Sequence, residues 1–250
     1  MKEKIYLILS LLFVINSSAK CADNGFSVFP SNKNIKQNSI FVISGYYSSQ
    51  DIIELLNKEY LVYLKSGDEK VNLIVSEFHK GQYNVSQSIL KPEKNLKIGL
   101  EYTLVIDSLP GNENLEKFNS ETYKYEPFKF IVTNDIDNEK PTFTSKPIII
   151  KNENHFLGCG TSSFVVFNCP ILDKSEYLVK ATIRNIKSNK TSTYYVNPYN
   201  GKISIGHGMC SGAFYLEEEN SYEVVFEIMD ASANYTIWNK EKIKFKKPKD

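Results

Sequence analysis

The sequence lacks an excess of either charge, a long apolar run beyond its first residues, and any nucleotide-binding motif. Its 30 basic and 29 acidic residues leave a formal net charge of +1, so nothing attracts a polyanion and we expect no nucleic-acid partner. Neither GxGxxG nor a P-loop occurs, and no motif singles out a pair of carboxylates for acid–base chemistry. We expect a protein that is not an enzyme and that carries no cofactor and no metal.

The first residues follow the order of a secretory signal peptide. Lys2 and Lys4 form a basic start, residues 5–15 run without a charge, and Ser17 and Ala19 are the small residues that a signal peptidase prefers. This uncharged run is shorter than the roughly 20 residues that a membrane-spanning helix needs. We expect residues 1–19 to be cleaved and the protein to be secreted or held at the cell surface, with no transmembrane segment after cleavage.

Cys21 leaves a second possibility open, because a cysteine just after a signal sequence can be acylated in a bacterial lipoprotein. The acylating machinery needs a small residue before the cysteine, and here that residue is Lys20. Lipid anchoring at Cys21 is therefore kept only as an alternative to a released protein.

Residues that suit β-strands are abundant. The chain has 16 Tyr and 15 Phe beside many Ile and Val, and only one Trp. Apolar and polar residues alternate with a period of two in several segments, which indicates strands with one solvated face. The expected strands are residues 39–46, 60–64, 71–76, 102–106, 128–133, 163–167, 178–186, 192–196, 222–228 and 243–245. A single short helix is expected over residues 49–57. The sequence thus predicts an all-β protein.

The chain is expected to divide near residues 134–141, where a polar segment replaces the alternating pattern. Aligning Tyr102 with Tyr222 also places Leu96 opposite Leu216, and both tyrosines then begin an alternating strand. Two related β-sandwich domains of roughly 110 residues fit this comparison. The predicted bounds are residues 23–135 for the first domain and 140–250 for the second.

A run in the first half, Leu90-Lys91-Pro92 followed by Leu96, Gly99, Tyr102 and Thr103, resembles the bacterial immunoglobulin-like domains of S-layer and other surface proteins. In the second half, residues 222–230 followed by Ala231-Ser232-Ala233-Asn234 are similar to the turn that closes the penultimate strand of such modules, although Ala233 stands where the family often has glycine. The resemblance implies tandem immunoglobulin-like sandwiches. Physically, Tyr102 can pack its ring inside while its hydroxyl caps the preceding connection, as in a tyrosine corner.

Three of the four cysteines lie in the second half, and export would place them where disulfides persist. Cys159 precedes one expected strand, and the internal alignment places Cys210 at the end of a later, antiparallel strand. The expected disulfide is therefore Cys159–Cys210, with Cys169–Cys210 as the alternative.

Two sharper interpretations of the same region stay open at this point. His155, Cys159, Cys169, His207 and Cys210 are all zinc-type ligands, although their spacing is not that of a structural zinc site. Residues 208–212 match a nucleophile elbow with cysteine in place of serine, but such an elbow needs a following helix, and the residues after it look extended.

Oxygen ligands gather near the predicted linker. Calcium between extracellular modules is coordinated by such groups, and the alternative is a solvated linker with an Asx-type turn. The residues concerned are Asn134, Asp135, Asp137, Asn138, Glu139, Asp230 and Asn234. Glycosylation sequons occur at Asn84, Asn189 and Asn234.

The favoured function is that of an exported, non-enzymatic interaction or adhesion protein that binds a protein or a cell surface. One alternative is a glycan-binding module, with tyrosines as stacking platforms at Tyr46, Tyr47, Tyr194, Tyr195 or Tyr199. Another is an accessory domain of an extracellular enzyme, with Cys210 acting beside His207 or His155. The fold alone is weak support for any function.

Overall fold

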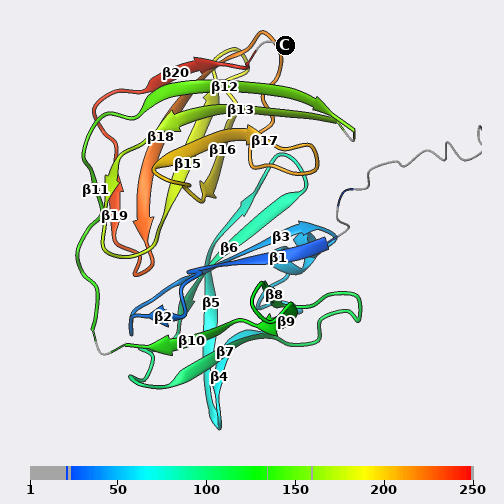
Figure 1. Cartoon of the computed structure of the whole chain (residues 1–250), viewed down its shortest axis with the longest axis vertical. Coiled ribbons are helices and arrows are strands. Elements are labelled where there is room, and N and C mark those ends of the chain that lie inside the picture. Colours follow the sequence, from blue (N-terminus) through cyan, green and yellow to red (C-terminus); the bar gives the residue numbers. More distant parts are fainter. Residues whose placement is uncertain (1–20, 22–23, 134, 159, 249–250) are drawn as a thin grey trace, which may run out of the picture.

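The computed structural model describes residues 21, 24–133, 135–158 and 160–248, and it confirms the all-β prediction. The predicted signal peptide, residues 1–19, lies outside the described residues. Figure 1 shows two groups of strands, one built from the first half of the chain and one from the second. The described helix, α2 (Ser49–Glu54), belongs to the first half and is shorter than expected, since Asn57 already has a left-handed φ of 61°.

The first half forms one continuous sheet in the order β1-β3-β6-β5-β4-β7-β10-β2, with a small hairpin, β8–β9, beside it. The strands are β1 (Asn24–Phe29), β2 (Asn34–Ile35), β3 (Phe41–Tyr47), β4 (Val62–Ser66), β5 (Glu69–Lys80), β6 (Val85–Pro92), β7 (Glu101–Ile106), β8 (Glu116–Asn119), β9 (Lys124–Pro127) and β10 (Lys129–Val132). The long strand β5 pairs with β4 over residues 69–72 and then with β6 from Leu73 onward, and the β5–β6 ladder has a register shift between Val75 and Glu77. It thereby connects the two layers that enclose a core around Phe41, Tyr102 and Phe130.

The second half forms separate sheets in the orders β12-β13-β17 and β16-β15-β18-β19, with β20 also paired to β18. The strands are β11 (Thr142–Phe143), β12 (Ile148–Leu157), β13 (Gly160–Asn168), β14 (Ile171–Leu172), β15 (Tyr177–Asn185), β16 (Thr191–Val196), β17 (Lys202–His207), β18 (Ser221–Asp230), β19 (Tyr235–Ile237) and β20 (Ile243–Lys246). The core between the two larger sheets includes Phe167, Val224 and Phe226, all fully buried. This half is therefore a two-layer sandwich.

The two halves share a strand-pairing order. The triplet β1-β3-β6 corresponds to β12-β13-β17, and the series β5-β4-β7-β10 corresponds to β16-β15-β18-β20. The expected tyrosine corner is confirmed: the buried Tyr102 accepts the backbone N–H of Lys97 at 3.2 Å. Tyr222 accepts the N–H of Glu217 at 2.7 Å in the same manner. An origin of the halves by duplication, and the domain bounds at 23–135 and 140–250, stay predictions.

The halves contact each other through a buried apolar cluster. Its members are Phe29, Ile40, Val42 and Ile89 from the first half and Leu178, Tyr195, Met229 and Ala231 from the second. Within it, the buried Gln87 side chain accepts the N–H of Tyr195 at 2.7 Å and donates to the carbonyl oxygen of the same residue at 3.2 Å. This reciprocal pair satisfies polar groups that burial would otherwise leave at a cost.

Candidate functional site

The disulfide differs from the predicted one. Cys210 is bonded to Cys21, across a sequence separation of 189 residues and a Cα–Cα distance of 5.6 Å. The pairing Cys159–Cys210 is therefore wrong for this structure; Cys159 itself lies outside the described residues. The alternative pairing with Cys169 is also wrong, because Cys169 is a free thiol.

The physical reason lies in the position of Cys210. Strand β17 ends at His207, so Cys210 falls in the following loop and faces the first half of the chain. There its carbonyl oxygen accepts hydrogen bonds from the Tyr47 hydroxyl at 2.6 Å and from the Asn84 side-chain nitrogen at 3.1 Å. The disulfide is thus one of several bonds that hold this loop against the first half.

The tip of the β5–β6 hairpin supplies further bonds to this loop. Tyr83 and Gly212 exchange two backbone hydrogen bonds, of 3.1 and 2.8 Å. Gln82 donates its N–H to the carbonyl oxygen of Ala213 and accepts the N–H of Tyr215 with its side chain. In Figure 1 the hairpin rises from the first group of strands toward β17. We name residues 208–215 the junction loop.

Among the described residues, no cysteine is placed to act as a nucleophile or as a zinc ligand. The sulfur of Cys210 is occupied by the disulfide, and Ala213–Leu216 forms no helix, so the nucleophile-elbow interpretation is wrong. Burial raises the pKa of Cys169 to about 12, which keeps its thiol protonated and unreactive. Of the five zinc-type residues, Cys159 lies outside the described residues, and the other four form no group of potential metal ligands there; the group that does meet is an acidic one.

The two histidines of that set have structural surroundings of different kinds. His207 is buried, stacks on Tyr215 with a centroid distance of 4.8 Å, and places Nδ1 at 3.0 Å from the carbonyl oxygen of Gly208. Tyr83 packs edge-on against the same imidazole ring. His155 lies exposed on β12, which β13 separates from β17. His207 therefore supports the junction loop, and the Cys210 sulfur that was expected to act beside either histidine is held in the disulfide.

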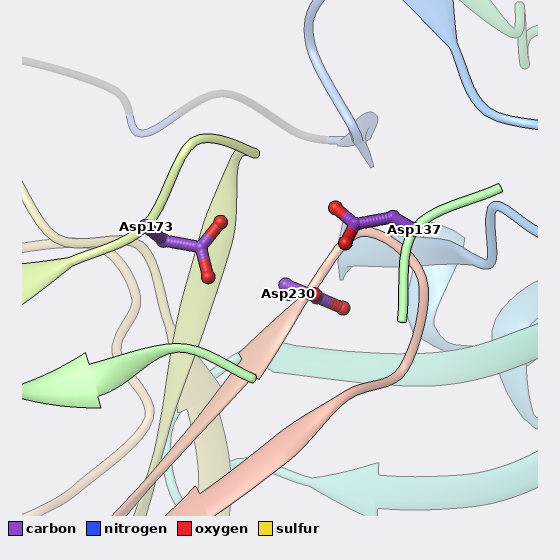
Figure 2. A group of neighbouring side chains, drawn as sticks. All are labelled: Asp137, Asp173 and Asp230. Carbon is purple, nitrogen blue, oxygen red and sulfur yellow. The ribbon is translucent and has the colours of Figure 1, made fainter. Parts of the chain in front are cut away.

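The acidic group consists of Asp137, Asp173 and Asp230, with side-chain oxygens within 4.8 Å of one another. Figure 2 shows the three carboxylates converging from the linker, the β14–β15 loop and the end of β18. Asp137 and Asp230 belong to the predicted oxygen-ligand set. Asp173 was missed by the sequence analysis, because only the tertiary fold brings it to the other two.

Most acceptors in this acidic group already have donors. One oxygen of the fully buried Asp230 accepts the N–H groups of Ser232 and Asn234, both at 2.8 Å, and the other accepts the Asn234 side chain at 2.8 Å. This is the Asx-type turn that the sequence suggested as an alternative. Asp137 accepts the Ser175 hydroxyl. The group therefore organises the turns where the linker meets the second half.

Burial and like charge act together on these carboxylates. Burial, followed by the neighbouring carboxylates, raises the pKa of Asp173, while the N–H of Ser175 lowers it. Burial also raises the pKa of Asp230 against the opposing effect of its hydrogen bonds. Three carboxylates in this arrangement offer oxygens of the kind that hard cations take. Since their own donors account for the geometry, we assign no ligand to the group.

The other predicted oxygen ligands do not join this group. Asp135 pairs with Lys36 and Thr133, Glu139 pairs with Lys174 at 3.0 Å, and Asn138 is exposed. Asn134 lies outside the described residues. The linker acids thus divide among separate ion pairs.

An exposed group of aromatic side chains projects from the first half. Phe118 on β8, Tyr125 on β9 and Tyr123 in the connecting turn are 53%, 68% and 80% exposed. The Phe118 ring meets Tyr125 at 5.5 Å and Tyr123 at 6.3 Å between centroids, both edge to face. We name this feature the aromatic hairpin, residues 116–127. Exposed apolar groups of this kind mark interaction sites more often than isolated ones do.

The turn of the aromatic hairpin is fixed by its own polar groups. The Asn119 side-chain oxygen accepts the N–H groups of Glu121 and Thr122, at 2.9 and 3.3 Å. Both Asn119 and Thr122 also donate to the Glu126 carboxylate, and these side-chain bonds lower the pKa of Glu126. The hairpin backbone that carries the rings is therefore ordered before any partner binds, which reduces the entropy lost on binding.

A groove of about 770 Å³ lies between the aromatic hairpin and β1. Phe118 and Tyr125 line it together with Lys117 and a set of amide side chains at Asn24, Asn112, Asn114 and Asn197. Aromatic, basic and amide groups side by side are typical of surfaces that bind other molecules.

The tyrosines proposed as glycan platforms mostly serve the fold. Tyr194 and Tyr195 are buried, so the prediction that they serve as glycan platforms is wrong. Tyr46 packs against the core of the second half, and the Tyr47 hydroxyl bonds the junction loop. Tyr46 and Tyr47 are half-buried, and Tyr199, 78% exposed, is the most exposed member of the set.

Two of the three sequons are engaged in the fold. The Asn84 side-chain nitrogen donates to the junction loop, and that of Asn234 donates to Asp230 and to the carbonyl oxygen of Asp137. Asn189 is exposed at a turn of positive φ. A glycan at Asn84 would therefore replace a bond between the halves, and one at Asn234 would replace bonds to Asp230 and to the linker, whereas one at Asn189 would do neither.

No protein-family model and no curated protein matches the chain. Among solved structures, pullulanase type I from Bacillus subtilis complexed with maltose aligns over 90% of the chain at 9% identity and a TM-score of 0.26. The FN1–FN3 domains of chicken CNTN1 align over 88% at 9% identity and 0.25, covering 63% of that chain. The Yersinia pseudotuberculosis adhesin InvE aligns over 89% at 11% identity and 0.24, covering 58% of that chain.

The chain spans about a quarter of the length of the pullulanases that it matches. Likenesses this weak say nothing about activity or partners. No helix in the described ranges is long and apolar enough to cross a membrane.

Proposed function

We propose that this chain is an exported, non-enzymatic interaction protein whose aromatic hairpin binds a protein partner at a cell surface or in the extracellular medium. The observation that carries the proposal is the group of three exposed rings at Phe118, Tyr123 and Tyr125. Tyrosine and other aromatic residues are enriched at protein interfaces and dominate their binding energy. A water-exposed aromatic group on a rigid two-stranded hairpin has no role in the core.

Export is part of this proposal and rests on the N-terminal sequence together with the disulfide. Disulfides persist in oxidising compartments and are rare in the cytosol. Because the Cys21 sulfur is bonded to Cys210, it is not available for the thioether of a lipid anchor, which favours release over lipidation. N-terminal sequencing of the protein recovered from the medium should give Lys20 as the first residue. Recovery of an intact Met1 from the cytosol alone would contradict export.

The binding test compares two variants with the native protein. Phe118→Ala combined with Tyr123→Ala and Tyr125→Ala removes the exposed rings, and Tyr199→Ala removes an equally exposed ring elsewhere. Each tagged protein is added to the producing cells, cross-linked, and its partners identified by mass spectrometry. We expect the same partners with the native protein and Tyr199→Ala, and their loss with the triple variant.

The thermal unfolding of all three proteins should coincide, because the replaced rings are exposed and contribute little to folding. Retention of every partner by the triple variant would contradict the proposal. A glycan is the second candidate, favoured by the amide side chains at Asn24, Asn112, Asn114 and Asn197 that line the neighbouring groove. A glycan array with the same variants separates the two, since glycan binding would give hits with purified sugars and without any protein partner.

A further inference from the structure

A cleft of about 330 Å³ lies between the two halves of the chain. Strands β1, β3 and β6 of the first half line one side of it, and β13, β15, β16, β17 and the junction loop of the second half line the other. The cleft adjoins the groove beside the aromatic hairpin, since Ser27, Val28 and Asn197 line both. Its volume is at the lower end of the roughly 300–1,000 Å³ of small-molecule sites.

The side chains that line this cleft are either apolar or polar without charge. Among the described residues, none of them is Asp, Glu, Lys, Arg or His. Most of the polar groups are hydroxyls and amides at Ser27, Ser44, Tyr46, Gln87, Tyr194 and Asn197. Because burying an ion without a charged partner is costly, this lining favours an uncharged ligand.

Small residues from both halves leave the space open. They are Ser44 on β3, Ser204 and Gly206 on β17, and Gly212 and Ala213 in the junction loop. The disulfide and the backbone bonds of the junction loop hold the second-half members of this set against the first half. The cleft is therefore formed before any ligand arrives, which reduces the entropy lost on binding.

The Tyr194 hydroxyl is a buried polar group without a hydrogen-bond partner in the described part of the chain. The residue is 6% exposed, and burial raises the pKa of its hydroxyl, so the proton stays in place. Ser44, Tyr46 and Gln87 are the polar side chains that act on this hydroxyl, and none of them makes a hydrogen bond with it. All three line the cleft, which places the hydroxyl end of the Tyr194 side chain there.

Two of these neighbours already have other partners. The Gln87 amide bonds the backbone of Tyr195 in both directions, and the Tyr46 hydroxyl lies 3.4 Å from the Ser27 hydroxyl. Buried polar groups in folded proteins generally have a partner, and an unpaired one carries a free-energy cost. The Tyr194 hydroxyl is therefore a donor that a molecule in the cleft can satisfy.

Tyr195 provides an internal comparison. Its hydroxyl also lacks a hydrogen-bond partner among the described residues. The groups that act on it are Tyr235, Glu77 and Glu227, and none of these lines the cleft. Two adjacent tyrosines thus carry unpaired hydroxyls, and only that of Tyr194 is surrounded by residues of the cleft.

We propose that the cleft between the halves binds an uncharged monosaccharide and that the Tyr194 hydroxyl donates a hydrogen bond to it. Sugar hydroxyls both donate and accept, as the hydroxyl and amide groups of the lining do. Phe164 and Val196 add apolar surface for the C–H groups of the sugar ring. Tyr194 acts here through its hydroxyl, since its buried ring is not a stacking platform.

Tyr194→Phe tests the donor, because it removes the hydroxyl and keeps the ring. Saturation-transfer NMR and calorimetric titration of the full-length protein measure binding of D-glucose, D-galactose, D-mannose and N-acetyl-D-glucosamine. We expect at least one of these sugars to bind, and Tyr194→Phe to weaken its binding at least tenfold, since a ligand hydroxyl then loses its partner. Tyr195→Phe is the matched control and should bind as the native protein does.

The stability of the free protein separates a ligand donor from a structural hydroxyl. Because the Tyr194 hydroxyl makes no bond in the chain, Tyr194→Phe should leave Tm unchanged or raise it. A lower Tm would show that the hydroxyl is already bonded in the free protein and would overturn its assignment as a ligand donor.

A second pair of variants tests the location. Ser204 is exposed on β17 and lines the cleft, so Ser204→Trp should block binding without disturbing the core. Lys202 is exposed two residues earlier on the same face of the strand and does not line the cleft. Lys202→Trp should therefore bind the sugar as the native protein does.

The outcomes are distinct. Failure of all four sugars to bind overturns the proposal, as does binding that survives both Tyr194→Phe and Ser204→Trp. Binding of D-glucuronate as tight as that of the best neutral sugar would contradict the uncharged character of the site. The triple variant of the aromatic hairpin should retain sugar binding even where it loses protein partners. Loss of the sugar in that variant, with retention in Tyr194→Phe, would place the sugar in the groove beside the hairpin instead.

Discussion

The disulfide between Cys21 and Cys210 should contribute a large share of the stability of this protein. Replacing both cysteines by serine releases a loop with a sequence separation of 189 residues, and the chain-entropy relation gives about 5 kcal/mol for that length. If the second half unfolds while the first stays folded, the loop runs from the end of β10 and has roughly 80 residues, for about 4.5 kcal/mol. Because the disulfide's contribution depends on the logarithm of the loop length, both unfolding routes predict nearly the same loss of unfolding free energy.

The other bonds of the junction loop remain in the variant. The carbonyl oxygen of Cys210 still accepts the Tyr47 hydroxyl and the Asn84 side chain, and Tyr83 still pairs with Gly212. The measured loss of unfolding free energy therefore reports the effect of removing the disulfide. Urea denaturation followed by tryptophan fluorescence and circular dichroism gives the unfolding free energy, and reduced native protein should behave as the double-serine variant does.

A loss below about 1 kcal/mol would refute this reasoning, because it would mean that the unfolded chain gains little freedom when the tie is cut. A large loss in the variant, with no loss on reduction of the native protein, would place the effect on the serine side chains instead.

Three further perturbations test the packing of the two halves. Tyr222→Phe and Tyr102→Phe each remove a hydroxyl that accepts a backbone N–H, and each should lower the unfolding free energy in urea by about 1 kcal/mol. Burial and neighbouring carboxylates raise the pKa of Asp173 above 3.8. The contribution of the protonated Asp173 carboxyl to the stability of the fold is therefore complete below pH 3.8 and is lost as the pH rises through the raised pKa. Asp173→Asn should accordingly raise Tm at pH 7 and not at pH 3. Gly206→Ala should cost roughly 3 kcal/mol, because its Cβ would lie 1.9 Å from a backbone oxygen of β13, whereas Gly111→Ala meets nothing within 4 Å and should be neutral.

Each of these expectations has a contrary result. Unchanged urea midpoints for both tyrosine variants would mean that water replaces the hydroxyl without cost. An Asp173→Asn protein that is less stable at pH 7 would show that the ionised carboxylate is needed there. Equal stability of the two glycine variants would contradict the close approach between β13 and β17.

The strands with a clear alternation were predictable from the sequence, because each has one buried and one solvated face. Tyr102 and Tyr222 begin two such strands, and their matching hydroxyl bonds explain why the internal alignment placed them together. Strand β12 was missed for the opposite reason: Ile148–Ile150 is followed by polar residues, and most of the strand is exposed, so it shows no period of two.

The candidate site was less predictable, because its geometry depends on how the halves meet. The partner of Cys210 was inferred from strands within one half, but the loop after β17 faces the other half, where Cys21 lies. Asp173 carries no local signal, since only folding brings it to Asp137 and Asp230. The aromatic hairpin lies between expected strands, and nothing in its sequence indicates that its rings avoid the core.

The long separation between Cys21 and Cys210 also sets the timing of oxidation. A chain that emerges N-terminus first at about 5–20 residues per second needs roughly 10–40 s to deliver the second cysteine after the first. All strands of the first sheet, β1 to β10, are available well before then. The first half therefore folds with an unpaired thiol at its start, and the disulfide closes only after residue 210 has emerged. A chain truncated before residue 210 would leave Cys21 open to mixed disulfides.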